Sequence, residues 1–148
     1  MKLGAIDQGT TSSRALILCG GKAEVGATFT HQQVYPHSGW VEHDPQELLK
    51  NVLACAAALE SVDALGIDNQ GESCLAWDRK TGAPISPVIV WQDNRTTDVT
   101  EKLKTEGHEE RVKTLSGLPL DPYFSASKLA WILENASAAK KNFFVKNV

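Results

Sequence analysis

The sequence has no apolar run long enough to cross a membrane and no apolar segment of secretory type near its N-terminus. We therefore expect a cytoplasmic protein with no membrane partner. It holds only three cysteines, Cys19, Cys55 and Cys74, an odd number without C-x-x-C spacing. This usage is typical of reduced, mostly buried thiols.

An excess of positive charge is also missing. The formal net charge is −3, and lysines and arginines are scattered without alternating with aromatic residues. No electrostatic argument or stacking surface therefore points to nucleic acid as a partner. Hydrophobic residues make up 42% and charged residues 22% of the 148 residues, as in ordinary globular proteins. This length suits one domain that buries roughly 70% of its unfolded surface.

Two common phosphate-binding motifs are absent as well. The sequence contains neither G-x-x-x-x-G-K-[ST] nor G-x-G-x-x-G. A P-loop and a dinucleotide-binding Rossmann turn are therefore excluded as the source of any phosphate site.

What the sequence does have is a polar hairpin near its start. Apolar residues 3–6 and 15–19 flank the segment DQGTTSSR at 7–14, which predicts a β-hairpin. Gly9 lets the backbone approach a ligand, and successive backbone N–H groups with hydroxyl donors form an anion-binding turn. Asp7, at a strand end, suits Mg²⁺ held through water, and Arg14 adds a positive charge. The alternative is an ordinary polar turn capped by Asp and Ser.

The rest of the chain predicts an α/β domain. A third strand is expected at 25–31 and a helix after Asp44, with Pro45 in its first turn. A buried parallel strand is expected at 64–69, strands at 75–77 and 88–91, and helices at 98–105, 109–115 and 125–135. The fold class is a mixed sheet with an antiparallel three-strand meander flanked by helices. A phosphate loop in the first hairpin favours an actin-like ATPase (ribonuclease H-like) domain.

Several side chains have expected structural roles. We expect Leu129, Ile132 and Leu133 to form the inner face of the last helix, and Asp93 to pair with Arg95. The histidines at 31, 37 and 43 recur every six residues, which does not suit a zinc site. They are expected to be solvated loop residues.

Five motifs in order carry a family resemblance. They are IDQGTTSSR at 6–14, GWVEHDP at 39–45, NQ-x-E at 69–72, VWQD-x-RT at 90–96 and DPYFS at 121–125. Together they resemble the N-terminal domain of the FGGY carbohydrate kinases, most of all its glycerol kinase branch, over residues 1 to about 135. The resemblance implies an ATP- and Mg²⁺-dependent transferase of carbohydrate metabolism with a small polyol or sugar as substrate.

The resemblance also implies roles for particular residues. In the hairpin it makes Asp7 the metal-associated acid and places Arg14 near the γ-phosphate. The remaining phosphate contacts that it implies are Gly9, Thr10, Thr11 and Ser12. In the polyol site, Glu72 matches an acceptor of substrate hydroxyls, Trp91 a surface for the carbon skeleton and Tyr123 a hydroxyl partner. Without the family, Glu72 reads as a strand-end acid, Trp91 as core and Tyr123 as a loop anchor.

The sequence departs from the family at Gly71, where an arginine is expected. Losing this forked donor removes a charged hydrogen bond of about 1.5–3 kcal/mol, a roughly 10- to 150-fold loss of glycerol affinity. Gly71 also opens space. The natural substrate is therefore expected to be larger than glycerol, such as a tetritol or pentulose.

No acid in the chain matches the family's catalytic base, which lies in a second domain. We expect residues 1–136 to be the substrate- and phosphate-binding half, residues 137–148 a tail or linker, and the C-terminal kinase domain to be absent. The chain alone is then inactive, as a domain or truncated product of a longer gene, and homo-oligomers are possible. The alternative is a lone actin-like domain that binds a ligand or partner without catalysis. An ATPase of chaperone or filament type is disfavoured by the motifs at Trp91 and Tyr123.

Overall fold

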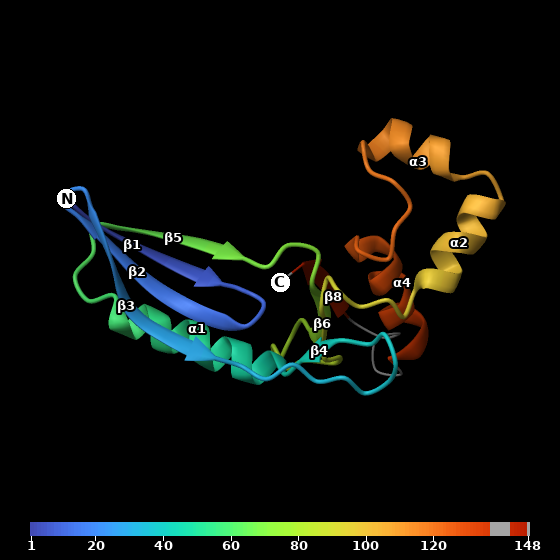
Figure 1. Cartoon of the computed structure of the whole chain (residues 1–148). Helices are drawn as coiled ribbons and strands as arrows, with labels where there is room; N and C mark the ends of the chain where they lie inside the picture. The colour runs from blue at the N-terminus through green and yellow to red at the C-terminus, as the bar shows by residue number, and fades with distance from the viewer. Residues whose placement is uncertain (137–142, 148) are drawn as a thin grey trace. The chain divides into compact units, whose positions relative to one another are not determined.

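Two units, each built from segments that are not contiguous in sequence, make up the chain. The structure is a computed structural model and describes residues 1–136 and 143–147. Unit 1 comprises Met1–Gln33 and His43–Gln70, and unit 2 comprises Val34–Glu42 and Gly71–Val148. The elements of both are labelled in Figure 1. The length and composition predicted one domain and did not indicate this division into two units.

Unit 1 is built on a four-stranded sheet. Its strands are β1 (Lys2–Gln8), β2 (Ser12–Cys19), β3 (Lys22–Thr30) and β5 (Ala64–Asn69), in the order β3-β2-β1-β5. β1, β2 and β3 pair antiparallel, whereas β5 runs parallel to β1. The predicted mixed sheet with an antiparallel meander is confirmed.

Helix α1 (Pro45–Ala58) packs against this sheet (Figure 1). It begins where the sequence predicts, because the Asp44 carboxylate accepts a hydrogen bond from the Gln46 N–H at 2.8 Å. The core between helix and sheet contains Ile6, Ala15, Cys55 and Leu59. This packing anchors the β1–β2 hairpin and with it the loop at its tip.

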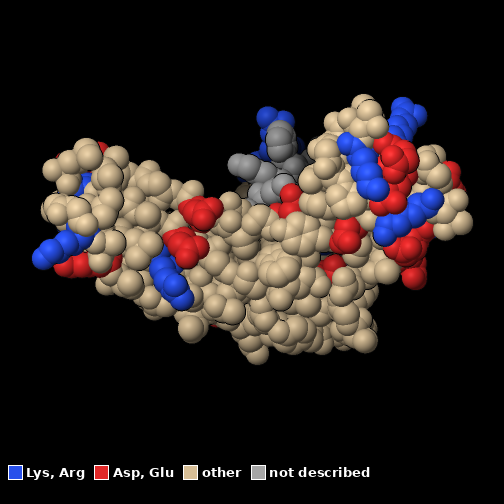
Figure 2. All heavy atoms as spheres, turned by 45° about the horizontal axis from the view of Figure 1, so that its top comes forward, with Lys and Arg blue, Asp and Glu red and all other residues tan. Residues whose placement is uncertain are grey.

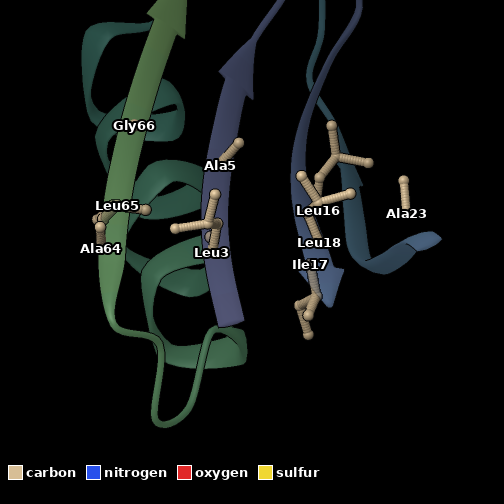
Figure 3. Close-up of a pocket in the computed structure, with 10 residues that line it drawn as sticks. Leu3, Ala5, Leu16, Ile17, Leu18, Ala23, Ala64, Leu65 and Gly66 are labelled. Atoms are coloured by element: carbon tan, nitrogen blue, oxygen red, sulfur yellow. The ribbon is translucent and has the colours of Figure 1, made fainter. Parts of the chain in front are cut away.

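Strand β5 is parallel, as predicted, but the expected burial is wrong. All six residues of β5 are exposed, Leu65 by 47% and Ile67 by 65%. The physical reason is that β5 forms the edge of the sheet, with β1 as its only strand neighbour among the described residues. Figure 3 shows Leu3, Leu16 and Leu65 around an apolar hollow of unit 1.

Unit 2 carries a second sheet, ordered β4-β7-β6-β8, and three helices. The strands are β4 (Glu42–His43, at the boundary of the units), β6 (Cys74–Asp78), β7 (Val88–Ile89) and β8 (Phe143–Asn147). The helices are α2 (Thr97–Thr105), α3 (Glu109–Ser116) and α4 (Ser125–Asn135). Its core contains Cys74, Ala76, Ile89 and Ile132. Each predicted strand and helix of this region is present.

The inner face of α4 differs from the prediction. Ile132 is fully buried and Leu129 packs beside it, as expected, but Leu133 is 39% exposed. Lys128 takes a buried place instead, with 0% exposure. It lies one helical turn before Ile132, so the buried stripe runs through 128 and 132 rather than through 133.

The predicted tail falls partly on strand β8, which pairs antiparallel with β6. Residues 137–142 and 148 of the predicted linker lie outside the described residues. Within the described part of the chain, no helix combines the length and the apolar character that crossing a membrane requires.

Charges of both signs mix on α2 and α3. Lys104 lies 2.7 Å from Glu101, and Lys113 lies 3.4 Å from Glu110. Figure 2 shows the same interspersed pattern on the face that it presents. Exposed pairs of this kind contribute little stability, so we interpret this surface as a solvated face.

Candidate functional site

The hairpin loop, defined here as residues 7–14, is tightly closed at the tip of β1 and β2. Asp7 and Arg14 are register partners, and the Gly9 N–H donates to the Ser12 carbonyl at 3.0 Å. A Cβ on Gly9 would lie 3.3 Å from that same carbonyl oxygen. The turn therefore favours glycine, and its backbone stays open to a close approach.

The polar side chains of the hairpin loop differ in exposure. Thr11 and Arg14 are exposed, and Asp7 and Thr10 are half-buried. Ser12 is only 8% exposed, so its hydroxyl is the least accessible of the predicted phosphate contacts. Asp68 of β5, which the sequence analysis did not single out, is the parallel register partner of Asp7.

Two buried glutamines at the strand ends hold the hairpin loop through hydrogen bonds. The Gln8 side-chain amide donates to the Gly9 carbonyl at 2.8 Å, and the Gln70 backbone N–H donates to the Gln8 carbonyl at 2.8 Å. The Gln70 amide also lies 3.4 Å from the Gln8 side-chain oxygen. Both glutamines stand inside motifs that carry the family resemblance, which gave neither of them a role.

His31 and His43 form a second support. His31 Nε2 lies 2.9 Å from the Thr10 carbonyl, to which it donates as the Nε2–H tautomer, and its ring meets His43 edge-on at 4.7 Å. The expectation of solvated histidines is wrong for both, which are 9% and 1% exposed, and correct for His37, which is exposed. Burial lowers the pKa of His43 below 6.5, against the opposing hydrogen bond to the Gln32 carbonyl.

In unit 2, Glu72 is fixed by the start of α4. Its Oε2 accepts a hydrogen bond from the Ser125 N–H at 2.7 Å. Helix α4 has no side-chain cap of its own, since Phe124 occupies its N-cap position. Glu72 also adopts the left-handed backbone region, with φ of 64°. It is therefore held in place, unlike a free strand-end acid.

Trp91 and Tyr123 come together in the same unit. Their ring centroids are 5.6 Å apart, and Tyr123 in turn meets the Phe124 ring edge-on at 5.1 Å. The Trp91 backbone N–H donates to the Ser73 hydroxyl at 3.0 Å. Trp91 is half-buried and Tyr123 is 42% exposed. We call Glu72, Trp91 and Tyr123 the Trp91 cluster. Its two rings contact each other and both remain partly exposed to solvent.

Gly71 adjoins the Trp91 cluster in sequence and is exposed. A Cβ at Gly71 would meet no described heavy atom within 4 Å apart from its chain neighbours. The structure thus leaves open space at the position where the resemblance led us to expect an arginine.

Arg95 does not fill the role of that arginine. Its side chain is fully buried, and its guanidinium pairs with Asp93 at 2.8 Å and Glu42 at 2.7 Å. It also lies over the Trp40 ring, 3.9 Å from the centroid. The predicted Asp93–Arg95 pair is confirmed, and Arg95 is a structural residue of unit 2.

Cys74 is unsuited to nucleophilic chemistry. It is fully buried, and burial raises its pKa to about 11, so the thiol stays protonated near neutral pH.

Among the described residues, no group of three His, Cys, Asp or Glu side chains is arranged to hold a metal ion. A cation at the hairpin loop would therefore need ligands beyond the protein, as Mg²⁺ bound to phosphates has.

Comparison with known proteins adds to this geometry. The model of the FGGY family of carbohydrate kinases, N-terminal domain, matches residues 2–144. Glycerol kinase of Paraburkholderia phytofirmans is 47% identical over 146 residues, covering 93% of this chain, and that of Burkholderia pseudomallei is 46% identical. The chain spans about 29% of the length of these relatives.

Solved structures agree. Plasmodium falciparum glycerol kinase with ADP matches 99% of this chain and 32% of its own, with a TM-score of 0.88 and 26% identity. Xylulose kinase from Rhodospirillum rubrum matches 99% of this chain and 32% of its own with a TM-score of 0.84 and 22% identity, which supports the fold alone. The expected actin-like ATPase fold is confirmed. The chain therefore belongs to the FGGY family of carbohydrate kinases and corresponds to its N-terminal domain.

Proposed function

We propose that this chain is the phosphate- and polyol-binding part of an ATP-dependent kinase that transfers the γ-phosphate to a primary hydroxyl of a polyol or sugar. The observation that carries the proposal is the Trp91 cluster within a chain that matches glycerol kinases over 93% of its length. Residues 1–136 supply the binding elements, and the catalytic base lies outside this chain. A cytoplasmic location and a homo-oligomeric state stay predictions.

The hairpin loop suits the phosphates of ATP, which the family uses. Phosphoryl transfer depends on positioning and charge stabilisation, and the loop offers hydroxyl donors at Thr10 and Thr11 with a cation at Arg14. Ser12 is the third proposed hydroxyl. Gly9 keeps the backbone accessible. These groups are of the kind that phosphate requires.

Mg²⁺ is proposed at Asp7. Magnesium usually keeps several waters and takes only one or two carboxylates besides substrate phosphates. Asp7 is half-buried at a strand end with Asp68 as its register partner, so the donor set fits. When bound, the ion would neutralise phosphate charge; the chain's own part is to hold the carboxylate in place.

The Trp91 cluster suits a polyol. Glu72 accepts hydrogen bonds from hydroxyl groups, while its bond to the Ser125 N–H fixes its orientation. The partly exposed face of Trp91 packs against a carbon skeleton, and the Tyr123 hydroxyl donates or accepts. Gly71 contributes space rather than a donor, which favours a substrate longer than glycerol.

Saturation-transfer NMR, which detects millimolar binding, tests this proposal on the chain itself. We expect transfer to a tetritol or pentulose in the wild-type protein, with weaker transfer to glycerol. Glu72→Gln and Trp91→Ala should each reduce binding about tenfold or more, while Trp77→Phe, a change at another tryptophan of unit 2, should not. Equal binding by all four proteins, or a clear preference for glycerol, would contradict the proposal.

A further inference from the structure

Lys128 is a buried charge outside the Trp91 cluster. Its side chain is fully buried in unit 2, and no carboxylate of the described chain forms an ion pair with it. A buried ammonium is costly unless hydrogen bonds compensate it. Burial accordingly lowers the pKa of Lys128. A buried lysine without a carboxylate partner indicates a specific structural or functional role.

The compensation comes from three consecutive backbone carbonyls. Lys128 Nζ donates to Pro122 at 2.8 Å, to Tyr123 at 2.5 Å and to Phe124 at 3.2 Å. An ammonium has three donors and no acceptor, so this set uses its full capacity. Three neighbouring carbonyls aimed at one nitrogen fix the backbone of residues 122–124 into one conformation.

That backbone carries Tyr123 and leads directly into Ser125. The Tyr123 ring contacts both Trp91 and Phe124, and the Ser125 N–H donates to the Glu72 carboxylate. The segment is thus anchored by Lys128 through its carbonyls and by Glu72 through an N–H. If the hydrogen bonds from Lys128 to these carbonyls are lost, the Tyr123 ring and the Glu72 carboxylate are no longer held in fixed positions.

We propose that Lys128 is a positioning residue of the polyol site, which sets the place of Tyr123 directly and of Glu72 through Ser125. The inference rests on the proposed polyol-binding role of the Trp91 cluster. The hairpin loop belongs to unit 1, so Lys128 governs polyol affinity and leaves the phosphate contacts untouched.

The test replaces the ammonium while keeping the volume. In Lys128→Met we expect the nuclear Overhauser contacts between the Trp91 and Tyr123 rings to disappear and amide exchange at Ser125 to rise at least tenfold. Polyol affinity should fall about tenfold, while the amide signals of residues 9–12 stay unchanged. Lys102→Met, at an exposed lysine of α2, is the matched control and should behave as the wild type.

A merely stabilising role gives a different result. It would lower the urea midpoint but leave the ring contacts and Ser125 exchange of the folded protein as they are, which overturns the proposal. If Lys128→Met does not fold, the wild type decides. The ammonium protons of Lys128 should exchange with water at least tenfold more slowly than those of Lys102, and equal rates would overturn the proposal.

The anchoring by Lys128 and the polyol-binding role of the Trp91 cluster can be tested separately. Ring contacts and amide exchange measure the anchoring without any polyol present. If the wild type binds no polyol although Lys128→Met loosens residues 122–125, the anchoring stands and its assignment to a polyol site is overturned.

Discussion

The hairpin loop of unit 1 and the Trp91 cluster of unit 2 are held in place by different chemistry. Side-chain amides and an imidazole support the loop: the amides of Gln8 and Gln70 and the ring of His31. Charged groups support the cluster: Lys128 binds the carbonyls of residues 122–124, and the Glu72 carboxylate binds the Ser125 N–H. Arg95 with Asp93 and Glu42 forms a further buried charge network of unit 2. One region relies on many modest hydrogen bonds, the other on a few buried charges.

This difference governs how each region responds to change. A neutral hydrogen bond contributes about 0.5–1.5 kcal/mol, so the loop should tolerate the loss of one support. Removing one partner of a buried ion pair leaves an uncompensated charge, which is far more damaging. Unit 2 should therefore be the more fragile to single substitutions, although its cluster is the more rigidly specified.

The largest effect is expected at Arg95. Arg95→Met leaves Asp93 buried without its partner and should lower the stability of unit 2 by about 3–5 kcal/mol. All four tryptophans lie in unit 2, so urea unfolding followed by tryptophan fluorescence reports on this unit.

Arg111→Met, at an exposed arginine of α3, is the control and should change stability by less than about 0.5 kcal/mol. Adding Asp93→Asn to Arg95→Met should restore part of the loss, because the stranded charge is then removed. A loss as small as that of Arg111→Met would show that charge does not hold this region.

The second largest effect is expected on glycerol affinity, through a substitution at Gly71 of unit 2. Gly71→Arg adds a forked donor where the structure leaves space, and should raise glycerol affinity roughly 10- to 150-fold, equivalent to about 1.5–3 kcal/mol. Gly71→Met fills the same space without donors and serves as the control. NMR titration with glycerol measures both. A gain shared by the methionine variant would mean that packing, and not the missing donor, sets glycerol affinity.

Acid should lower the stability of unit 1 through the buried imidazole of His43. The pKa of His43 is lowered by burial in the folded state, so below pH 6.5 the unfolded state binds more protons and stability falls with decreasing pH. The His43 Nε2 atom has no hydrogen-bond partner among the described residues, which agrees with a neutral ring. Amide exchange in β1 and β2 between pH 7.5 and 5.5 should show this slope. His43→Phe should flatten it and His37→Gln should not; an unchanged slope in His43→Phe would assign it to other groups.

The smallest effect concerns thiols, where the two units should behave alike. Cys55 of unit 1 and Cys74 of unit 2 are buried with raised pKa values, whereas Cys19 is exposed. A disulfide reagent at pH 8 should therefore modify one thiol per folded chain, and none in Cys19→Ser. Two reactive thiols would reveal local opening of one unit.

Sequence reasoning succeeded where local pattern decides structure. Apolar runs around a polar turn gave the β1–β2 hairpin, and Asp44 with Pro45 gave the start of α1, because both signals act within a few residues. The burial of β5 was wrong, since apolar composition predicts a strand but not whether it lies at a sheet edge. His31 and His43 were misjudged because their packing depends on the β3 end meeting the chain beside α1.

The side-chain contacts of unit 2 were the least predictable part. Glu72 and Ser125 are 53 residues apart, and so are Glu42 and Arg95. Nothing local signals such contacts. Lys128 left one readable cue, since it stands in phase with Ile132 on the apolar stripe of α4, where a charge calls for explanation. The family resemblance named Trp91 and Tyr123 but not the groups that hold them.

The central claim is that the two regions bind two different ligands, and residue-resolved NMR titration tests it most directly. With ATP and Mg²⁺, the amide signals of residues 9–12 should shift, while those of Trp91 and Tyr123 stay in place. With a tetritol or pentulose, the Trp91 indole and Tyr123 ring signals should shift in turn, and the hairpin loop should not respond. Shifts by neither ligand, or by the polyol at the hairpin loop alone, would contradict the account.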